Sequence, residues 1–82
     1  MGNEIKKQLQ DLQNLLNKKL LELDKLEQKK QDIVNRFKNA NQEDEINSLQ
    51  NEMNQNIQEF ASLEKQMEDI NSKVLQLKSK LK

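Results

Sequence analysis

Residues 36–46, RFKNANQEDEI, interrupt a seven-residue repeat of apolar side chains that runs through the chain on both sides of them. On each side the repeat alternates steps of four and three residues, but the step from Ala40 to Ile46 is six. The two extra residues rotate the apolar face by about 200° at roughly 3.6 residues per turn. A single straight helix would then carry its two stripes on different faces, so the segment predicts a turn between two helices.

The two apolar stripes mirror each other about residue 43. The first comprises Ile5, Leu9, Leu12, Leu16, Lys19, Leu23, Leu26, Lys30, Ile33, Phe37 and Ala40. The second comprises Ile46, Leu49, Met53, Asn56, Phe60, Leu63, Met67, Ile70, Val74, Leu77 and Leu81. Residues that would face each other in an antiparallel pair have numbers that always add to 86. This symmetry predicts an all-α fold, an antiparallel two-helix coiled-coil hairpin.

We expect a single coiled-coil domain over residues 1–82, with one helix at about 3–39, a turn at about 40–44 and a second helix at about 44–81. Asn39 and Asn41 are suited to a left-handed or capping residue in the turn, and Asn41 with Asp44 resembles a capping box. Two chains that exchanged their second helices would form the same layers. The hairpin and a domain-swapped antiparallel dimer are therefore both open.

Two polar residues of the stripes, Lys30 and Asn56, fall in the same layer of the hairpin. With the repeat lettered a to g, Lys30 is at an a position. A polar pair in the seam costs stability but penalises every register that sets either residue against leucine. We therefore expect Lys30 and Asn56 to form a register-setting polar layer.

Positions lettered g should face each other along one side of the hairpin. Arg36 then opposes Glu52, and Lys29 opposes Glu59, with opposite charges in both pairs. We expect two weak ion pairs beside the seam.

Several apolar residues lie off the seam and form a candidate partner or dimer face. They are Leu20, Val34 and Ile57 at e positions, and Ala61 and Leu75 at b positions. Val34 and Ile57 are expected to meet across one side of the hairpin, whereas Leu15 and Leu21 stand apart. These residues either widen the seam or form a docking face for further helices. A lone hairpin of this size is only marginally stable, so we expect a dimeric four-helix bundle or a longer coiled-coil dimer.

The composition excludes most catalytic chemistry. The chain has neither Cys nor His, so thiolate and imidazole nucleophiles, bases and metal ligands are missing. The serines are on solvated faces, the acidic residues have no enclosed cleft, and no Gly-rich loop could hold a phosphate. We expect a non-enzymatic protein without catalytic, cofactor-binding or metal-binding residues.

Partners are expected to be proteins. The 14 basic residues are balanced by 14 acidic ones, and no aromatic side chains are placed to stack on bases, so nucleic acid is not expected. No apolar stretch is long enough to span a membrane and no secretory leader is visible, so we expect a cytoplasmic protein that binds itself or another helical protein.

These features predict a coiled-coil scaffold, adaptor or assembly subunit. The alternative is a small chaperone or inhibitor that covers a partner's amphipathic helix. In size and architecture alone, with no shared motif, the chain resembles the small helical-hairpin chaperones of bacterial secretion systems. A scaffold is expected to be a stable homo-oligomer by itself, whereas a chaperone is expected to be loosely folded until its client is added.

Overall fold

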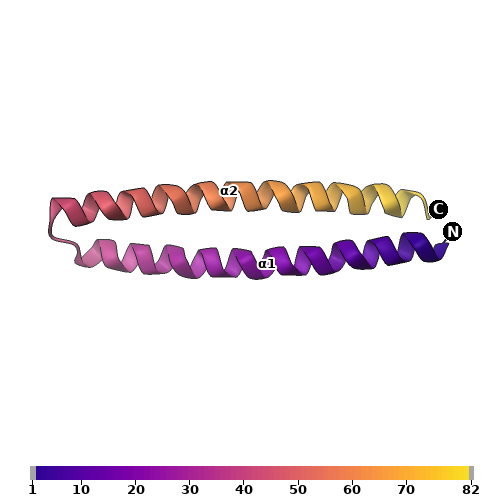
Figure 1. Ribbon diagram of the computed structural model, residues 1–82, viewed down its shortest axis with the longest axis horizontal. Coiled ribbons are helices and arrows are strands. Elements are labelled where there is room, and N and C mark those ends of the chain that lie inside the picture. The colour runs from indigo at the N-terminus through magenta and orange to yellow at the C-terminus, as the bar shows by residue number, and fades with distance from the viewer. Residues whose placement is uncertain (1, 82) are drawn as a thin grey trace.

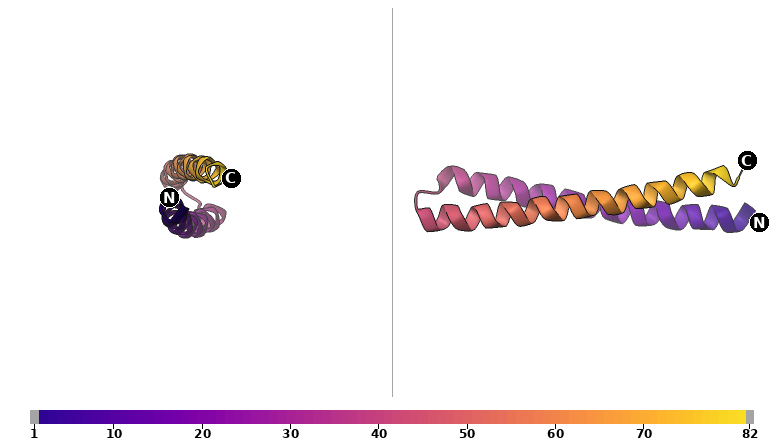
Figure 2. Two further views of the ribbon diagram at one scale, coloured as in Figure 1. Left: turned by 90° about the vertical axis from the view of Figure 1, so that its right-hand side faces the viewer. Right: turned by 90° about the horizontal axis from the view of Figure 1, so that it is seen from above.

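The computed structural model describes residues 2–81, which form two long helices joined by a short connection (Figure 1). α1 spans Gly2–Asn39 and α2 spans Glu43–Ser79. The helices lie side by side and antiparallel, so the start of α1 and the end of α2 are at the same end (Figure 1). They cross at a shallow angle (Figure 2), and their Cα atoms occupy a rod of 62 × 15 × 13 Å. The predicted all-α antiparallel hairpin is confirmed.

Both helices can be long because the chain has no Pro and its one Gly is at position 2. Charges at the turn favour the helix ends. Arg36 and Lys38 lie in the last turn of α1, and three acidic residues lie in the first turn of α2. At the far end α2 finishes at Ser79, so Leu81, the expected last seam residue, follows the helix and is exposed.

The connection, residues 40–42, leaves α1 through a tightened last turn. The backbone N–H of Ala40 donates to the carbonyl of Phe37 at 3.2 Å. No residue between 2 and 81 has a positive φ, so the left-handed alternative for Asn39 and Asn41 is wrong. The Nδ2 of Asn39 instead donates to the carbonyl of Asn35 in the last turn of α1 at 3.3 Å. The expected Asn41–Asp44 capping box is also wrong, because the N-cap is Gln42, with φ −107° and ψ 142°. Asn41 lies one residue too early, and within the described chain no side chain caps α2.

The missing cap gives a testable prediction. Glu45 already occupies the third helical position, so Gln42→Ser would complete a capping box. We expect Gln42→Ser to stabilise the hairpin by about 0.5–1 kcal/mol, which raises the Tm by a few degrees in a thermal melt. Asn41→Ser, which introduces the same residue outside the cap, is the control. Equal effects of the two variants would contradict the assignment of the N-cap.

The core is a single line of side chains between the helices. Of the described residues, five are buried: Ile33, Leu49, Asn56, Leu63 and Ile70. All five occupy d positions of the repeat. The large a-position side chains, among them Leu23 and Phe60, are only half-buried. The a positions are therefore less well covered than most d positions of α2, and the d residues Leu12 and Leu26 of α1 are half-buried as well.

Candidate functional site

Asn56 is the one polar residue in the core, with 1% of its surface exposed. Its Nδ2 donates to the backbone carbonyl of Leu26 at 3.2 Å, whereas its Oδ1 has no hydrogen-bond partner among residues 2–81. Lys30 lies at the same height but is exposed, and it borders the groove that reaches Asn56. Lys30 and Asn56 are therefore neighbours, as expected, but Asn56 is buried and Lys30 is exposed to solvent. The register-setting role of the pair stays a prediction.

One long side of the hairpin, the bridged face, carries the g positions. Here the predicted ion pair between Arg36 and Glu52 is confirmed, with Nη2 to Oε1 at 3.0 Å and Nη1 to Oε2 at 3.2 Å. The Nε of Arg36 also contacts Asp32 at 3.1 Å. The hydrogen bonds to Glu52 raise the pKa of the Arg36 guanidinium, and the charges of Glu52 and Asp32 add to this rise. The bridge ties α1 to α2 close to the turn.

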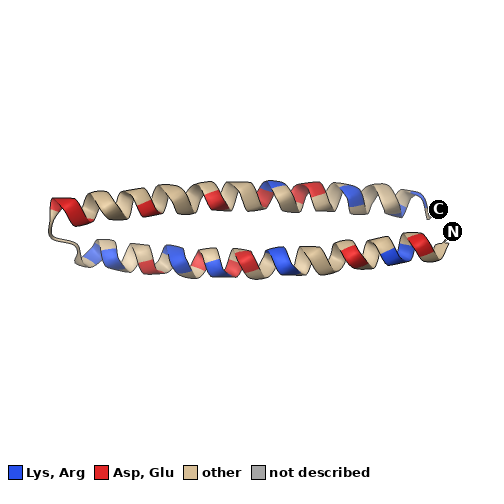
Figure 3. Cartoon of the chain, in the orientation of Figure 1, with Lys and Arg blue, Asp and Glu red and all other residues tan. Residues whose placement is uncertain are grey.

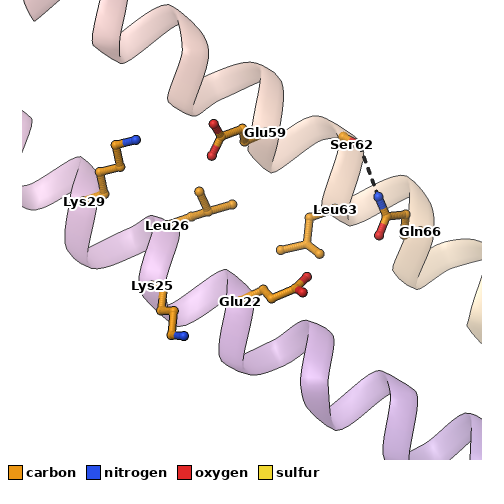
Figure 4. A pocket seen from close by; sticks show the side chains of 8 residues that line it. All are labelled: Glu22, Lys25, Leu26, Lys29, Glu59, Ser62, Leu63 and Gln66. Atoms are coloured by element: carbon orange, nitrogen blue, oxygen red, sulfur yellow. Dashed lines mark hydrogen bonds between the residues drawn. The ribbon is translucent and has the colours of Figure 1, made fainter.

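Farther along the bridged face, Leu26 and Leu63 point toward each other between the helices (Figure 4). Polar residues surround them, including Lys29 and Glu59, in an open groove of about 410 Å³. Among the described residues no ion pair joins Lys29 to Glu59, so the second predicted bridge is wrong. A lysine that reaches water freely gains little by holding one geometry. Most residues that line the groove are polar, and its two apolar side chains, Leu26 and Leu63, belong to the seam.

The opposite side, here called the open face, carries the e and b positions and is more apolar. Half-buried a-position side chains border it: Leu16, Leu23, Met53, Phe60 and Met67. Two adjacent grooves of about 400 and 440 Å³ run along it. Leu16, Leu23 and Met67 line the first together with Glu68 and Asn71. Met53, Ile57 and Phe60 line the second together with Glu27, Lys30 and Asn56. Glu64 borders both grooves. The open face is therefore the larger continuous apolar surface of the hairpin.

The predicted partner-face residues are distributed unevenly along this surface. Leu20 and Ile57 are 43% and 57% exposed. Ala61 is also exposed and Val34 is half-buried. Leu75 is 60% exposed, but it lies 18 residues beyond Ile57, or about 27 Å along α2. The structure therefore groups four of the residues around the middle of the rod and leaves Leu75 near its open end.

Val34 and Ile57 do not face each other at the same height. Ile57 shares a groove with Glu27 and Lys30 of α1. Val34 is about one turn closer to the connection. The two side chains extend the same face at neighbouring heights, which corrects the expectation of a direct opposition.

Sequence reasoning missed the contribution of the a positions to this surface. In a heptad, a residues neighbour e positions and d residues neighbour g positions. On the g side, Glu52 and Glu59 are only half-exposed and lie against the seam, whereas e positions such as Leu20 and Ile57 leave the a residues partly uncovered. The asymmetry could have been found by comparing the length of the g and e side chains.

Positive and negative side chains are interspersed along α1, whereas α2 is acidic from the turn to Glu64 and has its first basic residue at Lys65 (Figure 3). Within residues 2–81 no group of three or more Asp, Glu, His or Cys side chains could hold a metal ion, and no helix there is long and apolar enough to cross a membrane. Compared with known proteins, the chain matches no family model, no curated protein and no solved structure.

Proposed function

We propose that this chain is a non-enzymatic protein–protein interaction module, a coiled-coil scaffold or assembly subunit that associates with itself through the open face. The observation that carries the proposal is the pair of adjacent apolar grooves flanked by exposed Leu20 and Ile57. Exposed apolar strips of this kind on a helix pair favour packing against further helices. Two hairpins packed on this face form a four-helix bundle.

The stability of the hairpin supports the same conclusion. Five buried side chains are a small core for two helices of 38 and 37 residues. Small domains commonly gain the missing stability by oligomerisation. Burial of the half-exposed Met53, Phe60 and Met67 in a dimer would add stability, because each Å² of apolar surface removed from water contributes about 25 cal/mol.

Sedimentation of the wild type and two double variants tests the proposal. We expect Leu20→Glu with Ile57→Glu to weaken the dimer by more than about 100-fold, because each dimer would then bury four new charges. The matched control is Leu15→Glu with Leu21→Glu, since these leucines are 40% and 63% exposed but lie off the open face. The control should leave the dimer intact.

Two results would overturn the proposal. One is a thermally stable wild-type monomer at micromolar concentration. The other is an equal loss of association in both double variants, because this would place the contact elsewhere. A loosely folded monomer that gains helix only on addition of an amphipathic peptide would instead support the alternative function, a small chaperone for a partner's helix.

A further inference from the structure

Four of the five apolar residues of the open face share a common centre along the rod, and Leu75 alone lies outside this group. In the hairpin, Glu27 of α1 and Glu59 of α2 are at the same height, because facing residues have numbers that add to 86. The midpoint between Leu20 and Val34 along α1 is residue 27. The midpoint between Ile57 and Ala61 along α2 is residue 59. The two apolar pairs, which lie on different helices, are therefore both centred on one height of the rod.

We propose that two chains pack open face to open face and antiparallel, with a two-fold axis at the height of Glu27. This inference rests on the self-association proposed above. The axis places Leu20 against Val34 of the partner chain, and Ile57 against Ala61 of the partner chain. A two-fold contact is made twice, so each dimer gains both apolar pairs in two copies.

The charges on this face fit the same axis. Asp24 and Lys30 are also equidistant from residue 27, so Lys30 meets Asp24 of the partner chain. Among the described residues, neither side chain makes an ion pair within its own hairpin. They are six residues apart on one helix and cannot pair with each other. The ammonium of Lys30 is exposed at the edge of the groove, where a partner carboxylate could reach it.

The polar contacts that α2 would make in this dimer are also compatible with the proposed axis. Gln50 is set against Glu68 of the partner chain, and Asn54 against Glu64 of the partner chain, since both pairs are centred on residue 59. Neither contact brings like charges together. The one unfavourable contact is Glu27 against its own copy at the axis, with the two Lys30 ammonium groups three residues away.

Two chains can also pack open face to open face with both turns at the same end. This parallel arrangement makes far fewer apolar contacts between the chains. It places Leu20 at the height of Glu64 and Glu68 of the partner chain. Val34 would then lie beside Asn54 of the partner chain. No exposed leucine, isoleucine or valine of the open face would meet another one. The antiparallel stack is therefore the arrangement that the sequence and the hairpin support together.

Spin labels on single cysteines test the arrangement, because the chain has no natural Cys. Gln28→Cys and Ser72→Cys both place the label on the solvated back of a helix. In the antiparallel dimer the two Gln28 labels lie within about 20 Å, whereas the Ser72 labels are about 40 Å apart along the rod. With both turns at one end, each distance is set by bundle width alone and stays below about 30 Å. Two similar short distances would overturn the inference.

A charge exchange tests the register. Lys30→Glu and Asp24→Lys should each weaken the dimer by about tenfold, and the double variant should return to within about threefold of wild type. Lys29→Glu, next to Lys30 but on the bridged face, is the control and should change the affinity little. A dimer whose affinity the double exchange fails to restore would reject this register while leaving self-association intact. Absence of any dimer would instead reject the proposed function itself.

Discussion

Asn56→Asp should destabilise the hairpin by about 3 kcal/mol or more at pH 7, the largest loss we expect from any single substitution of a polar residue. Asn56 is 1% exposed, and its Nδ2 donates to the carbonyl of Leu26. An ionised aspartate cannot donate, so the buried carboxylate would face a carbonyl oxygen without a hydrogen bond. Burial would therefore raise the pKa of the new carboxyl.

The raised pKa fixes the sign of the pH dependence. Between the unfolded pKa of about 3.9 and the raised folded pKa, the folded state binds more protons than the unfolded state. Stability relative to the wild type should then recover as the pH falls from 7, and the recovery should be complete below about 3.9. Urea unfolding at several pH values, at one protein concentration, measures this.

Asn51→Asp is the matched control, since it adds the same charge to the same helix at an exposed position on its solvated back, away from the open face. It should change the free energy of unfolding by no more than about 0.5 kcal/mol. If Asn56→Asp costs no more than this control, the buried position of Asn56 is contradicted.

The fold could be predicted because it depends on the phase of the repeat. The six-residue step from Ala40 to Ile46 would leave a straight helix with its two apolar stripes on different faces. The absence of Pro, and of any Gly after position 2, allows the rest of the chain to be helical. The same phase argument set Arg36 opposite Glu52, and the structure has them bonded at 3.0 Å. Both conclusions follow from helix geometry alone.

The environment of each side chain could not be predicted in the same way. Lys30 and Asn56 have equivalent positions in the pattern, but a lysine has a long stem that carries its charge to water. An asparagine is too short to leave the seam, so Asn56 is buried and bonds to the backbone. The loss of the Lys29–Glu59 pair has a similar cause, because solvated flexible side chains are not fixed by the pattern. The N-cap was also not predictable, because α2 begins one residue later than the Asn41–Asp44 capping box requires, and this makes Gln42 the N-cap.

The candidate surface was identified from exposed apolar positions, but its extent depends on packing. The pattern assigns Leu16, Phe60 and Met67 to the seam and treats them as covered. In the structure the buried residues are all d positions, and Leu16, Phe60 and Met67 are left half-buried along the open face. The repeat alone does not say which seam residues are fully covered.

Replacing both Lys30 and Asn56 by leucine should raise the Tm, by about 10 °C or more. The change removes the unpaired Oδ1 of Asn56 and adds two apolar side chains at about 1.5–3 kcal/mol each when buried, against one lost hydrogen bond. Asn56→Leu alone should give most of the gain, because Lys30 is exposed. A lower Tm in the double variant would contradict the assignment of the polar layer.

The same double variant should lose specificity in association. Within one chain the connection at residues 40–42 already limits how far α1 and α2 can slip. A register-setting role must therefore act mainly between chains, where exposed Lys30, expected to meet Asp24 of the partner chain, is the member of the pair that a partner can reach. Sedimentation of the double variant should show several oligomers where the wild type shows one. A single species with wild-type mass and a higher Tm would indicate that the polar layer reduces stability without selecting the register.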